Sequence, residues 1–366
     1  MRNFFFSIFS YFLLPLSMEA TPLYHVFEST RIQGFGSAGA AFVEGEEAIF
    51  YNPARINHGS RMRQVNIISP QAGIGGVALE FMIDPNRYGK LTFTEEEIVK
   101  LIQTENLYIS AQNHTGAVLD KSAFGVLTRS YMQMEFVGDL ELFDTLKVDS
   151  TIYIYNGVYY GFSREVLKNF EVGVLLKVIQ KSEIIFNEDM ISLLETAIVD
   201  EDRNFLRKFH GNLGFGFGVD LGLNYTIPRE EYEFSFALVG QNLGGQRFFG
   251  ANPPPMDKTL INFGTSYKKK LLEAKQEIIA ALDFKDLLSL YNKKFSKKIH
   301  FGLMWKYLEY ASVSIGLNQG YPTAGVTLGY KIFEFEMAAY GTELGDKIGS
   351  KPSVRFSAMG RLGWIF

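Results

Sequence analysis

Apolar and polar residues alternate with a period of two over long stretches of this chain from about residue 64 onward. In 212–225 the odd-numbered positions are aliphatic or aromatic, and the even-numbered positions are mostly glycine, with Asn212, Asp220 and Asn224 among them. Successive side chains of a β-strand point to opposite faces, so this pattern predicts a strand with one apolar and one polar face. The stretch is more than twice as long as a typical globular strand of roughly 5–6 residues. It fits a wall that has lipid on one side and a wet, crowded interior on the other.

The same pattern predicts fourteen strands in all, with connectors that are alternately short and long apart from the short connector at 319–321. The predicted strands are 64–83, 106–114, 122–136, 150–163, 169–186, 209–225, 231–242, 257–269, 275–286, 297–307, 310–318, 322–332, 333–342 and 352–366. Bacterial outer-membrane barrels have an even number of antiparallel strands, short periplasmic turns and longer outer loops. The sequence therefore predicts an all-β fold, a transmembrane antiparallel β-barrel of about 14 strands. A large soluble β-sandwich with solvated polar faces is the alternative.

Composition narrows the class of protein further. The 366 residues are 47% hydrophobic and 15% aromatic, yet the mean hydropathy is only +0.01. After the first twenty residues no stretch reaches the roughly 18 apolar residues of a membrane-spanning helix. The net charge of -4, without long basic runs, gives no support for a nucleic-acid partner. Because cysteine is absent, disulfides, thiolate metal sites and cysteine nucleophiles are excluded.

The first twenty residues have the pattern of a secretory signal peptide. Arg2 supplies a short positive region, Phe4 to Met18 form an apolar region, and Ala20 offers a small residue for cleavage. We expect residues 1–20 to be removed after export through the periplasm, with an uncleaved anchor as the alternative.

The C-terminal strand carries a second targeting pattern. Phe356, Leu362, Trp364 and Phe366 share one face of the predicted strand. A chain that ends in an aromatic residue after such alternation resembles the signal that the outer-membrane barrel-assembly machinery recognises.

Enzymatic chemistry finds little support in the sequence. The five histidines are scattered without metal-ligand spacing, and no G-x-S-x-G elbow is present. Gly34, Gly36 and Gly39 match the dinucleotide-binding fingerprint literally, but no strand precedes them and no βαβ unit follows. We expect these glycines instead to let an N-terminal segment pack closely against the barrel wall. The sequence predicts no cofactor, no metal and no catalytic residue, although a barrel lipase or protease stays an alternative.

The stretch from Ala38 to Ala54 reads AGAAFVEGEEAIFYNPA. A small-residue run, an acidic segment, an aromatic pair and Asn-Pro-Ala before the first strand resemble the FadL-like family of outer-membrane transporters. The tail at 312–345 looks more like a second branch, the PorV-like and TraF-annotated barrel proteins.

The FadL-like resemblance implies that residues 21–62 fold into the lumen as a hatch and that 63–366 form the barrel. The hatch motif would be Tyr51, Asn52, Pro53 and Ala54. A turn is physically reasonable here, because Pro53 fixes φ and Asn52 can bond its own backbone. Whether the segment only plugs the pore or moves as a gate stays open.

Three outer connectors carry apolar residues. Two of them are predicted helices, near 94–102 and 188–206, and the third connector contains a run of three prolines. The candidate substrate-capture residues are Ile98, Leu101, Ile102, Met190, Ile191, Leu194, Ile198, Phe248 and Phe249. These residues could collect a lipophilic ligand, or they could simply pack on the barrel rim.

The resemblance and the apolar mouth together predict a passive outer-membrane channel for small hydrophobic, long-chain-fatty-acid-like molecules. Its partners would be outer-membrane lipid and the hydrophobic ligand. The alternative is a PorV-like scaffold that binds a secretion-system protein, and an aqueous porin is a third possibility.

Overall fold

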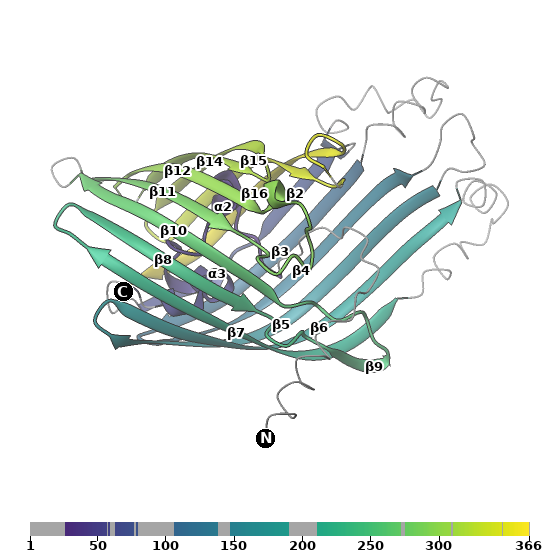
Figure 1. The fold of residues 1–366 in the computed structure, drawn as a ribbon, viewed down its shortest axis with the longest axis horizontal. Helices are drawn as coiled ribbons and strands as arrows, with labels where there is room; N and C mark the ends of the chain where they lie inside the picture. Colours follow the sequence, from purple (N-terminus) through teal and green to yellow (C-terminus); the bar gives the residue numbers. More distant parts are fainter. Residues whose placement is uncertain are drawn as a thin grey trace, which may run out of the picture.

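The computed structural model describes residues 26–56, 58, 63–76, 78–79, 106–137, 147–189, 211–271, 275–308, 310–345 and 347–365. Their strands form one antiparallel sheet that closes on itself through pairing of β1 and β2 with both β3 and β16 (Figure 1). The strands are β1 (Arg63–Ile68), β2 (Gln71–Gly76), β3 (Asn106–Leu119), β4 (Ser122–Val137), β5 (Lys147–Leu167), β6 (Phe170–Asp189), β7 (Asn212–Pro228), β8 (Tyr232–Gln241), β9 (Phe248–Asn252), β10 (Leu260–Leu271), β11 (Gln276–Phe284), β12 (Ile299–Tyr307), β13 (Ala311–Asn318), β14 (Tyr321–Tyr330), β15 (Phe333–Glu343) and β16 (Pro352–Ile365). The short helices are α2 (Thr30–Gly34), η1 (Gly45–Glu47), α3 (Ala48–Tyr51), η2 (Pro53–Arg55) and η6 (Phe295–Lys298).

The described wall has fourteen strands, as the alternation predicts. Sixteen strands are named, but β1 and β2 are two halves of one interrupted strand, and β9 pairs only with β7. The expectation for 243–256 was wrong in one respect, because this connector contains β9. Three of its five residues pair with the N-terminal part of β7, which β8 does not reach.

The first strand is broken, which corrects the continuous strand predicted at 64–83. Asn66 pairs with Gly116 and Gln71 pairs with Gln112, so four residues on one strand face three on the other. Pro70, which has no backbone donor, lies within this bulge. Two side chains of β3 satisfy nearby backbone groups. Thr115 Oγ1 donates to Ile67 O at 2.8 Å, and Ser69 N donates to Asn113 Oδ1 at 3.1 Å.

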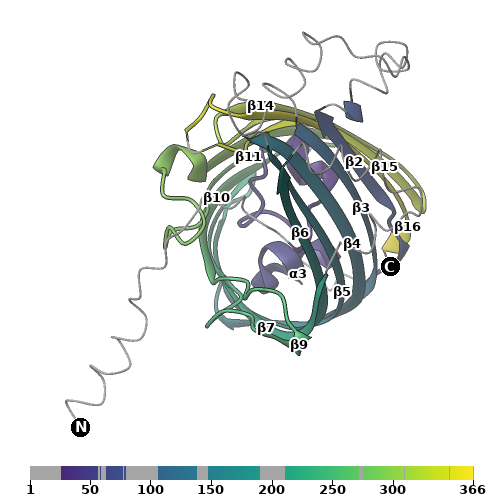
Figure 2. The same cartoon turned by 90° about the vertical axis from the view of Figure 1, so that its right-hand side faces the viewer.

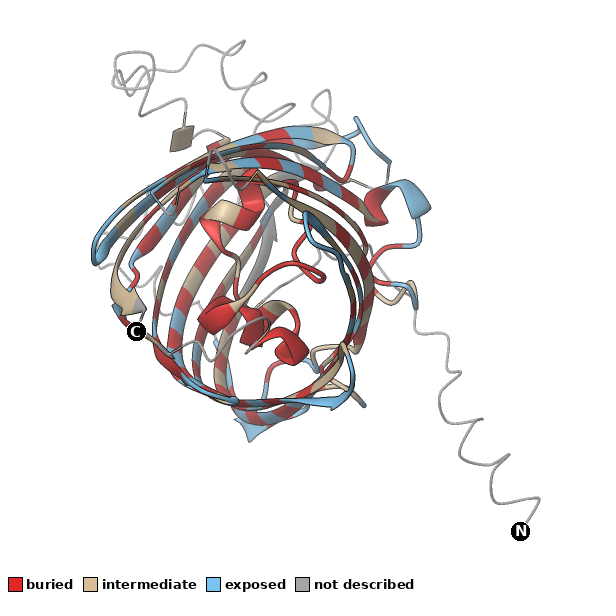
Figure 3. Cartoon of the chain, turned by 90° about the vertical axis from the view of Figure 1, so that its left-hand side faces the viewer, coloured by how far each residue is buried: buried red, intermediate tan, exposed pale blue. Residues whose placement is uncertain are grey.

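The strands present unlike faces to the two sides of the wall. On β7, the Phe215 and Phe217 side chains are 54% and 70% exposed, whereas Asp220 is 2% exposed. Buried and exposed residues alternate along neighbouring strands in the same way (Figure 3). The outer surface is apolar and the inner surface is polar, which is the arrangement expected of a barrel in a bilayer.

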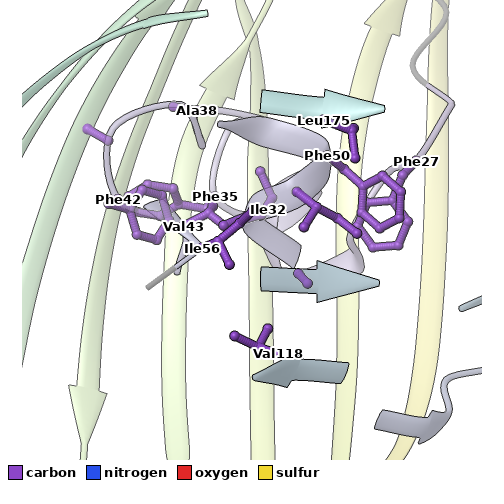
Figure 4. Packing of buried hydrophobic residues seen from close by; sticks show 14 of the residues in the cluster. Phe27, Ile32, Phe35, Ala38, Phe42, Val43, Phe50, Ile56, Val118 and Leu175 are labelled. Carbon is purple, nitrogen blue, oxygen red and sulfur yellow. The ribbon is translucent and has the colours of Figure 1, made fainter. Parts of the chain in front are cut away.

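Residues 26–56 lie inside the ring of strands, where α2 and α3 are enclosed by the wall (Figures 2 and 3). The largest hydrophobic cluster joins this N-terminal segment to inward-facing wall residues (Figure 4). The segment contributes Phe27, Ile32, Phe35, Phe42, Val43, Ile49, Phe50 and Ile56, and the wall contributes Val118, Leu127, Tyr159, Leu175, Ile279 and Met304. The main core of the molecule is therefore inside the barrel.

Several predicted features lie outside the described residues. These are the signal peptide at 1–20, the capture residues Ile98, Leu101, Ile102, Met190, Ile191, Leu194 and Ile198, and the terminal Phe366. The predicted helix at 188–206 begins too early, because β6 continues to Asp189. Among the residues described, no helix is long and apolar enough to cross a membrane.

Candidate functional site

The glycine run at 34–39 packs directly onto the backbone of the wall. A Cβ on Gly34 would lie 2.6 Å from the Cα of Gly325, and a Cβ on Gly36 would lie 1.9 Å from the Phe301 carbonyl oxygen. Gly36 also has a φ of 68°, a conformation that residues with a side chain rarely adopt. At Gly39 a Cβ would meet the Tyr51 ring at 2.8 Å. As expected, these glycines let the N-terminal segment pack closely against the barrel wall. The role of the segment as a hatch stays a prediction.

The end of the same run binds a carboxylate of the wall. Gly39 N and Ala40 N both donate to Asp283 Oδ2, at 2.7 and 2.9 Å. Asp283 lies on β11 and is 1% exposed. Adjacent backbone N–H groups form a local anion site, and here an aspartate of the chain itself occupies it. In this glycine run, the backbone N–H groups of Gly39 and Ala40 thus bind a carboxylate of the protein itself, and the match to the dinucleotide fingerprint does not require a nucleotide.

Asn52, Pro53 and Ala54 form a tight turn, as the residue types suggest. Asn52 Oδ1 accepts a hydrogen bond from Ala54 N at 3.0 Å and so caps η2, in which Pro53 is the first residue. Asn52 Nδ2 donates to Ala40 O at 3.0 Å and to Leu223 O at 3.3 Å. The turn is thereby tied both to the glycine run and to β7.

Two paired glycines of the wall make room for this turn. Gly173 on β6 is the register partner of Gly222 on β7. A Cβ on Gly173 would lie 2.2 Å from the Pro53 carbonyl carbon, and a Cβ on Gly222 would lie 2.0 Å from Asn52 Oδ1. The sequence shows the glycine-rich face of β7, but it does not show which part of the chain packs against that face.

The remaining motif residue, Tyr51, ends α3 and connects the two ends of the segment. Its hydroxyl accepts a hydrogen bond from Ser29 N at 2.9 Å. The ring also lies edge-on to Phe27, with the two ring centroids 6.2 Å apart. The contacts of Tyr51 therefore stay within the N-terminal segment and hold its fold together.

The acidic turn at 44–47 is joined by ion pairs to opposite parts of the wall. Glu44 lies 3.6 Å from Lys268 on β10. Glu47 lies 2.8 Å from Arg31 and also pairs with Arg361 on β16. Neighbouring wall strands are also joined by ion pairs such as Lys177–Asp220, but the bridges from the wall to the segment have no counterpart in the sequence pattern.

Two neighbouring glutamates of this turn are in opposite electrostatic states. Burial raises the pKa of Glu47, but Arg361 and Arg31 outweigh burial and lower it to about 2. At Glu46 burial dominates over Arg361 and raises the pKa to about 7. Glu46 is 2% exposed, and neither carboxylate oxygen has a hydrogen-bond partner. The turn therefore holds one firmly charged carboxylate and one that gains a proton near neutrality.

A polar chamber of about 60 Å³ lies between the segment and the outer connectors. Residues of the segment, the wall and two connectors line it: Glu28, Gln33, Ser37, Arg129, Tyr131, Lys285, Asn292, Lys297, His300, Asn318, Gln319, Tyr340, Thr342, Glu343 and Arg355. Lysines and arginines outnumber the glutamates among them by four to two. The chamber thus has an excess of positive charge.

Arg355 is the cation of this chamber that stacks on an aromatic ring. Its guanidinium carbon lies 3.8 Å from the centroid of the Tyr108 ring, and it donates to Gln133 Oε1 at 3.1 Å. Arg129, in contrast, pairs with Glu28 at 3.0 Å. The Tyr108 ring continues into a row of tyrosines on β4 and β5, with successive centroids 5.5–6.0 Å apart. Cationic and aromatic groups are therefore adjacent in the part of the lumen between the segment and the outer connectors.

Phe248 and Phe249 do not form the apolar outer loop that was expected. Both lie on β9, where Phe248 is 6% exposed and Phe249 is 64% exposed. The Phe248 ring packs beside Gly214 and Gly216 of β7, and its centroid lies 5.2 Å from Lys181 Nζ. Phe248 therefore lies on a strand and faces the lumen, because β-pairing directs adjacent side chains to opposite faces, and its part in substrate capture stays a prediction. Only Phe249 offers apolar surface to the outside.

The C-terminal residues complete the seam of the barrel. Phe356 is exposed on the outer face of β16, and Leu362 and Trp364 on the same face are half-buried. β16 pairs with β15 on one side and with β1 and β2 on the other. Recognition of this strand by the assembly machinery stays a prediction. Within the described residues, no group of three or more potential ligands could hold a metal ion.

Comparisons with known proteins add the fold relationship. No protein-family model and no curated protein sequence matches the chain. Among solved structures, the toluene transporter TbuX of Ralstonia pickettii matches with a TM-score of 0.55 and 13% identity, over 93% of this chain and 98% of that one. The CymD monoaromatic hydrocarbon channel matches with a TM-score of 0.50 and 12% identity, over 92% and 97%. A Pseudomonas aeruginosa FadL homologue covers similar shares, 92% and 97%, with 11% identity and a TM-score of 0.43. At such identities the first two likenesses show the fold alone. The resemblance read from the sequence is confirmed at that level: the chain has the FadL-like β-barrel fold.

Proposed function

We propose that this protein is an outer-membrane channel for passive uptake of small hydrophobic molecules, in which the N-terminal segment acts as the hatch. The observation that carries the proposal is a closed wall, apolar outside, whose lumen contains a segment docked by glycine contacts and ion pairs. Such a segment limits free diffusion of water-soluble solutes. The proposal therefore requires the segment, or part of it, to move when a ligand passes.

The chamber above the segment supports a more specific ligand class. TbuX and CymD are described as a toluene transporter and a monoaromatic hydrocarbon channel. In this chain the part of the lumen between the segment and the outer connectors combines aromatic rings with an excess of Lys and Arg. Arg355 forms no ion pair within 4.0 Å among the described residues. An anionic head group with an apolar tail matches that combination better than a neutral hydrocarbon does. We therefore favour a fatty-acid-like amphiphile.

Uptake by proteoliposomes tests the function. Vesicles containing the protein should take up a fluorescent fatty acid faster than empty vesicles, and a variant lacking residues 26–56 should also pass small sugars. No increase for any lipophilic compound, with or without the segment, would contradict the proposal. Sugar permeation through the intact protein would instead indicate an aqueous porin.

A charge-neutralising substitution tests the ligand class. Arg355→Met should weaken fatty-acid binding roughly tenfold, the effect of losing one charge-assisted hydrogen bond. Arg164→Met, which changes an exposed arginine close to the β5–β6 turn, is the matched control and should leave binding unchanged. Equal binding by both variants would remove the support for an anionic ligand.

The PorV-like scaffold stays an untested alternative. Residues 312–345, which suggested it, form most of β13, β14 and β15 in the wall. A protein that co-purifies stoichiometrically from the native membrane would favour the scaffold over the channel.

A further inference from the structure

His58, just beyond the N-terminal segment in sequence, lies against β6 and β8, and carboxylates face both of its ring nitrogens. Nδ1 lies 2.8 Å from Glu171 Oε2, and Nε2 lies 3.1 Å from Glu233 Oε1. The His58 side chain is 9% exposed, so water cannot readily replace either carboxylate. Glu171 and Glu233 are the second residues of β6 and β8, next to the short turns that precede these strands.

This geometry requires a particular protonation state of the imidazole. Neutral imidazole donates one hydrogen bond and accepts one, and a carboxylate can only accept. A neutral His58 would therefore place a lone pair against one of the two carboxylates. Only the imidazolium donates to both, and its positive charge also offsets part of their negative charge.

The two carboxylates are fixed in place by other groups. Asn224 Nδ2 donates to Glu171 Oε2 at 2.8 Å, and Ser235 Oγ donates to Glu233 Oε1 at 3.2 Å. They cannot turn away freely when the imidazole loses its proton.

Among the residues that the structure describes, further charged groups near His58 come from the segment and from β10. On the segment these are Arg55, whose guanidinium is 4.0 Å from Glu233, and Glu44, which is 3.1 Å from Arg55. Lys268 on β10 is 3.6 Å from Glu44. Glu44 and Lys268 lie close enough to offset each other, and Arg55 is the cation whose charge opposes protonation of His58.

We propose that His58 is a pH-sensitive clamp, which holds the end of the segment against β6 and β8 as an imidazolium and releases it on deprotonation. The clamp deepens the proposed function, because it rests on the segment being a hatch. Burial by itself lowers the pKa of His58, but the hydrogen bonds to Glu171 and Glu233 outweigh burial and raise it above the ordinary 6.5. The contribution to docking is therefore complete below pH 6.5 and is lost as the pH rises through the raised pKa.

Hydrogen–deuterium exchange of the full chain in detergent tests the clamp without any transport assay. Peptides from residues 26–56 are followed from about pH 6 to about pH 9, with rates corrected for intrinsic exchange and with β7 peptides as the internal reference. We expect roughly tenfold faster exchange in the segment at the upper end of this range, the effect of one lost charge-assisted hydrogen bond.

Two variants of His58 make the test specific. His58→Gln should exchange fast at every pH, and His58→Arg, which keeps a permanent cation, should stay protected throughout. Glu171→Gln should be intermediate, because Glu233 still accepts one bond. Two results would overturn the clamp. The first is segment exchange in the wild type that does not change with pH. The second is segment exchange in His58→Gln that equals that of the wild type at every pH. Because exchange reports docking alone, failure to transport any ligand would leave this result intact.

Discussion

Gly173→Ala adds a single methyl group to the wall beneath the Asn52–Pro53–Ala54 turn. The new Cβ would lie 2.2 Å from the Pro53 carbonyl carbon, where ordinary contact begins at 3.4 Å. Because the obstacle is backbone and not a flexible side chain, the turn must retreat by about 1.2 Å, the difference between these distances. The methyl group points into the lumen, so the pairing of β6 with β5 and β7 should be kept.

The expected loss can be built from two contributions. Overpacking typically costs about 1–3 kcal/mol. The retreat would also break the 3.3 Å hydrogen bond from Asn52 Nδ2 to Leu223 O, which contributes roughly 1 kcal/mol. We therefore expect docking of the segment to weaken by roughly 2–4 kcal/mol, about two orders of magnitude in the docking equilibrium.

Hydrogen–deuterium exchange of residues 26–56 measures this change, and the heat-dependent gel mobility of the folded barrel shows that the wall stays intact. Gly360→Ala is the control, because a Cβ there meets nothing within 4 Å. If segment exchange in Gly173→Ala equals that in Gly360→Ala, the turn does not depend on the glycine niche, and the reasoning fails.

Three further predictions concern the same segment. Asn52→Ala removes the cap of η2 and should weaken docking by roughly 2 kcal/mol. Asn52→Asp keeps the cap acceptor but places a buried carboxylate oxygen against the carbonyl oxygens of Ala40 and Leu223, so it should weaken docking at least as much in the same exchange assay. Arg361→Met should destabilise the segment by roughly 3–5 kcal/mol by leaving the buried Glu47 with one partner fewer, and adding Glu47→Gln should recover part of the loss in thermal unfolding. Glu46 has a pKa raised from 4.5 to about 7, so the docked state binds the proton more tightly and docking should weaken as the pH rises from 4.5 to about 7 and then level off. Glu46→Gln should abolish that slope, and a slope that persists would assign it to another group.

The period-two pattern predicted most of the wall because each strand of a membrane barrel must present apolar groups to lipid and polar groups to the lumen. That constraint fixes the faces of β7 residue by residue, and it also fixed the strand count. The alternation does not show where a strand is interrupted, as it is between β1 and β2. Pro70 is the one local signal of the break in the first strand, since proline cannot donate within a sheet, and the continuous strand predicted at 64–83 did not take it into account. At β9, the neighbouring glycines and the run at 253–255 favoured a loop, although the free edge of β7 provides a pairing partner.

The candidate site was predictable only where local chemistry determines it. The Asn52–Pro53 turn follows from residue types, and so does the need for glycine at position 36. The partners of Glu47 do not, because Arg361 is more than three hundred residues away along the chain. The long-range ion pairs, and the space that Gly173 and Gly222 leave for the turn, depend on how the strands close into a barrel. A local sequence pattern contains no information about that closure.

An outer-membrane barrel requires the outer face of its wall to be in contact with lipid. The absence of cysteine allows a single-cysteine scan along β7 after reconstitution, in which a fluorophore is attached at successive positions from 213 to 223 and quenched by brominated lipid. The structure predicts strong quenching at the odd-numbered positions and little at the even-numbered ones. Equal, weak quenching at both sets, with full access of a water-soluble quencher, would show that the wall does not lie in a membrane.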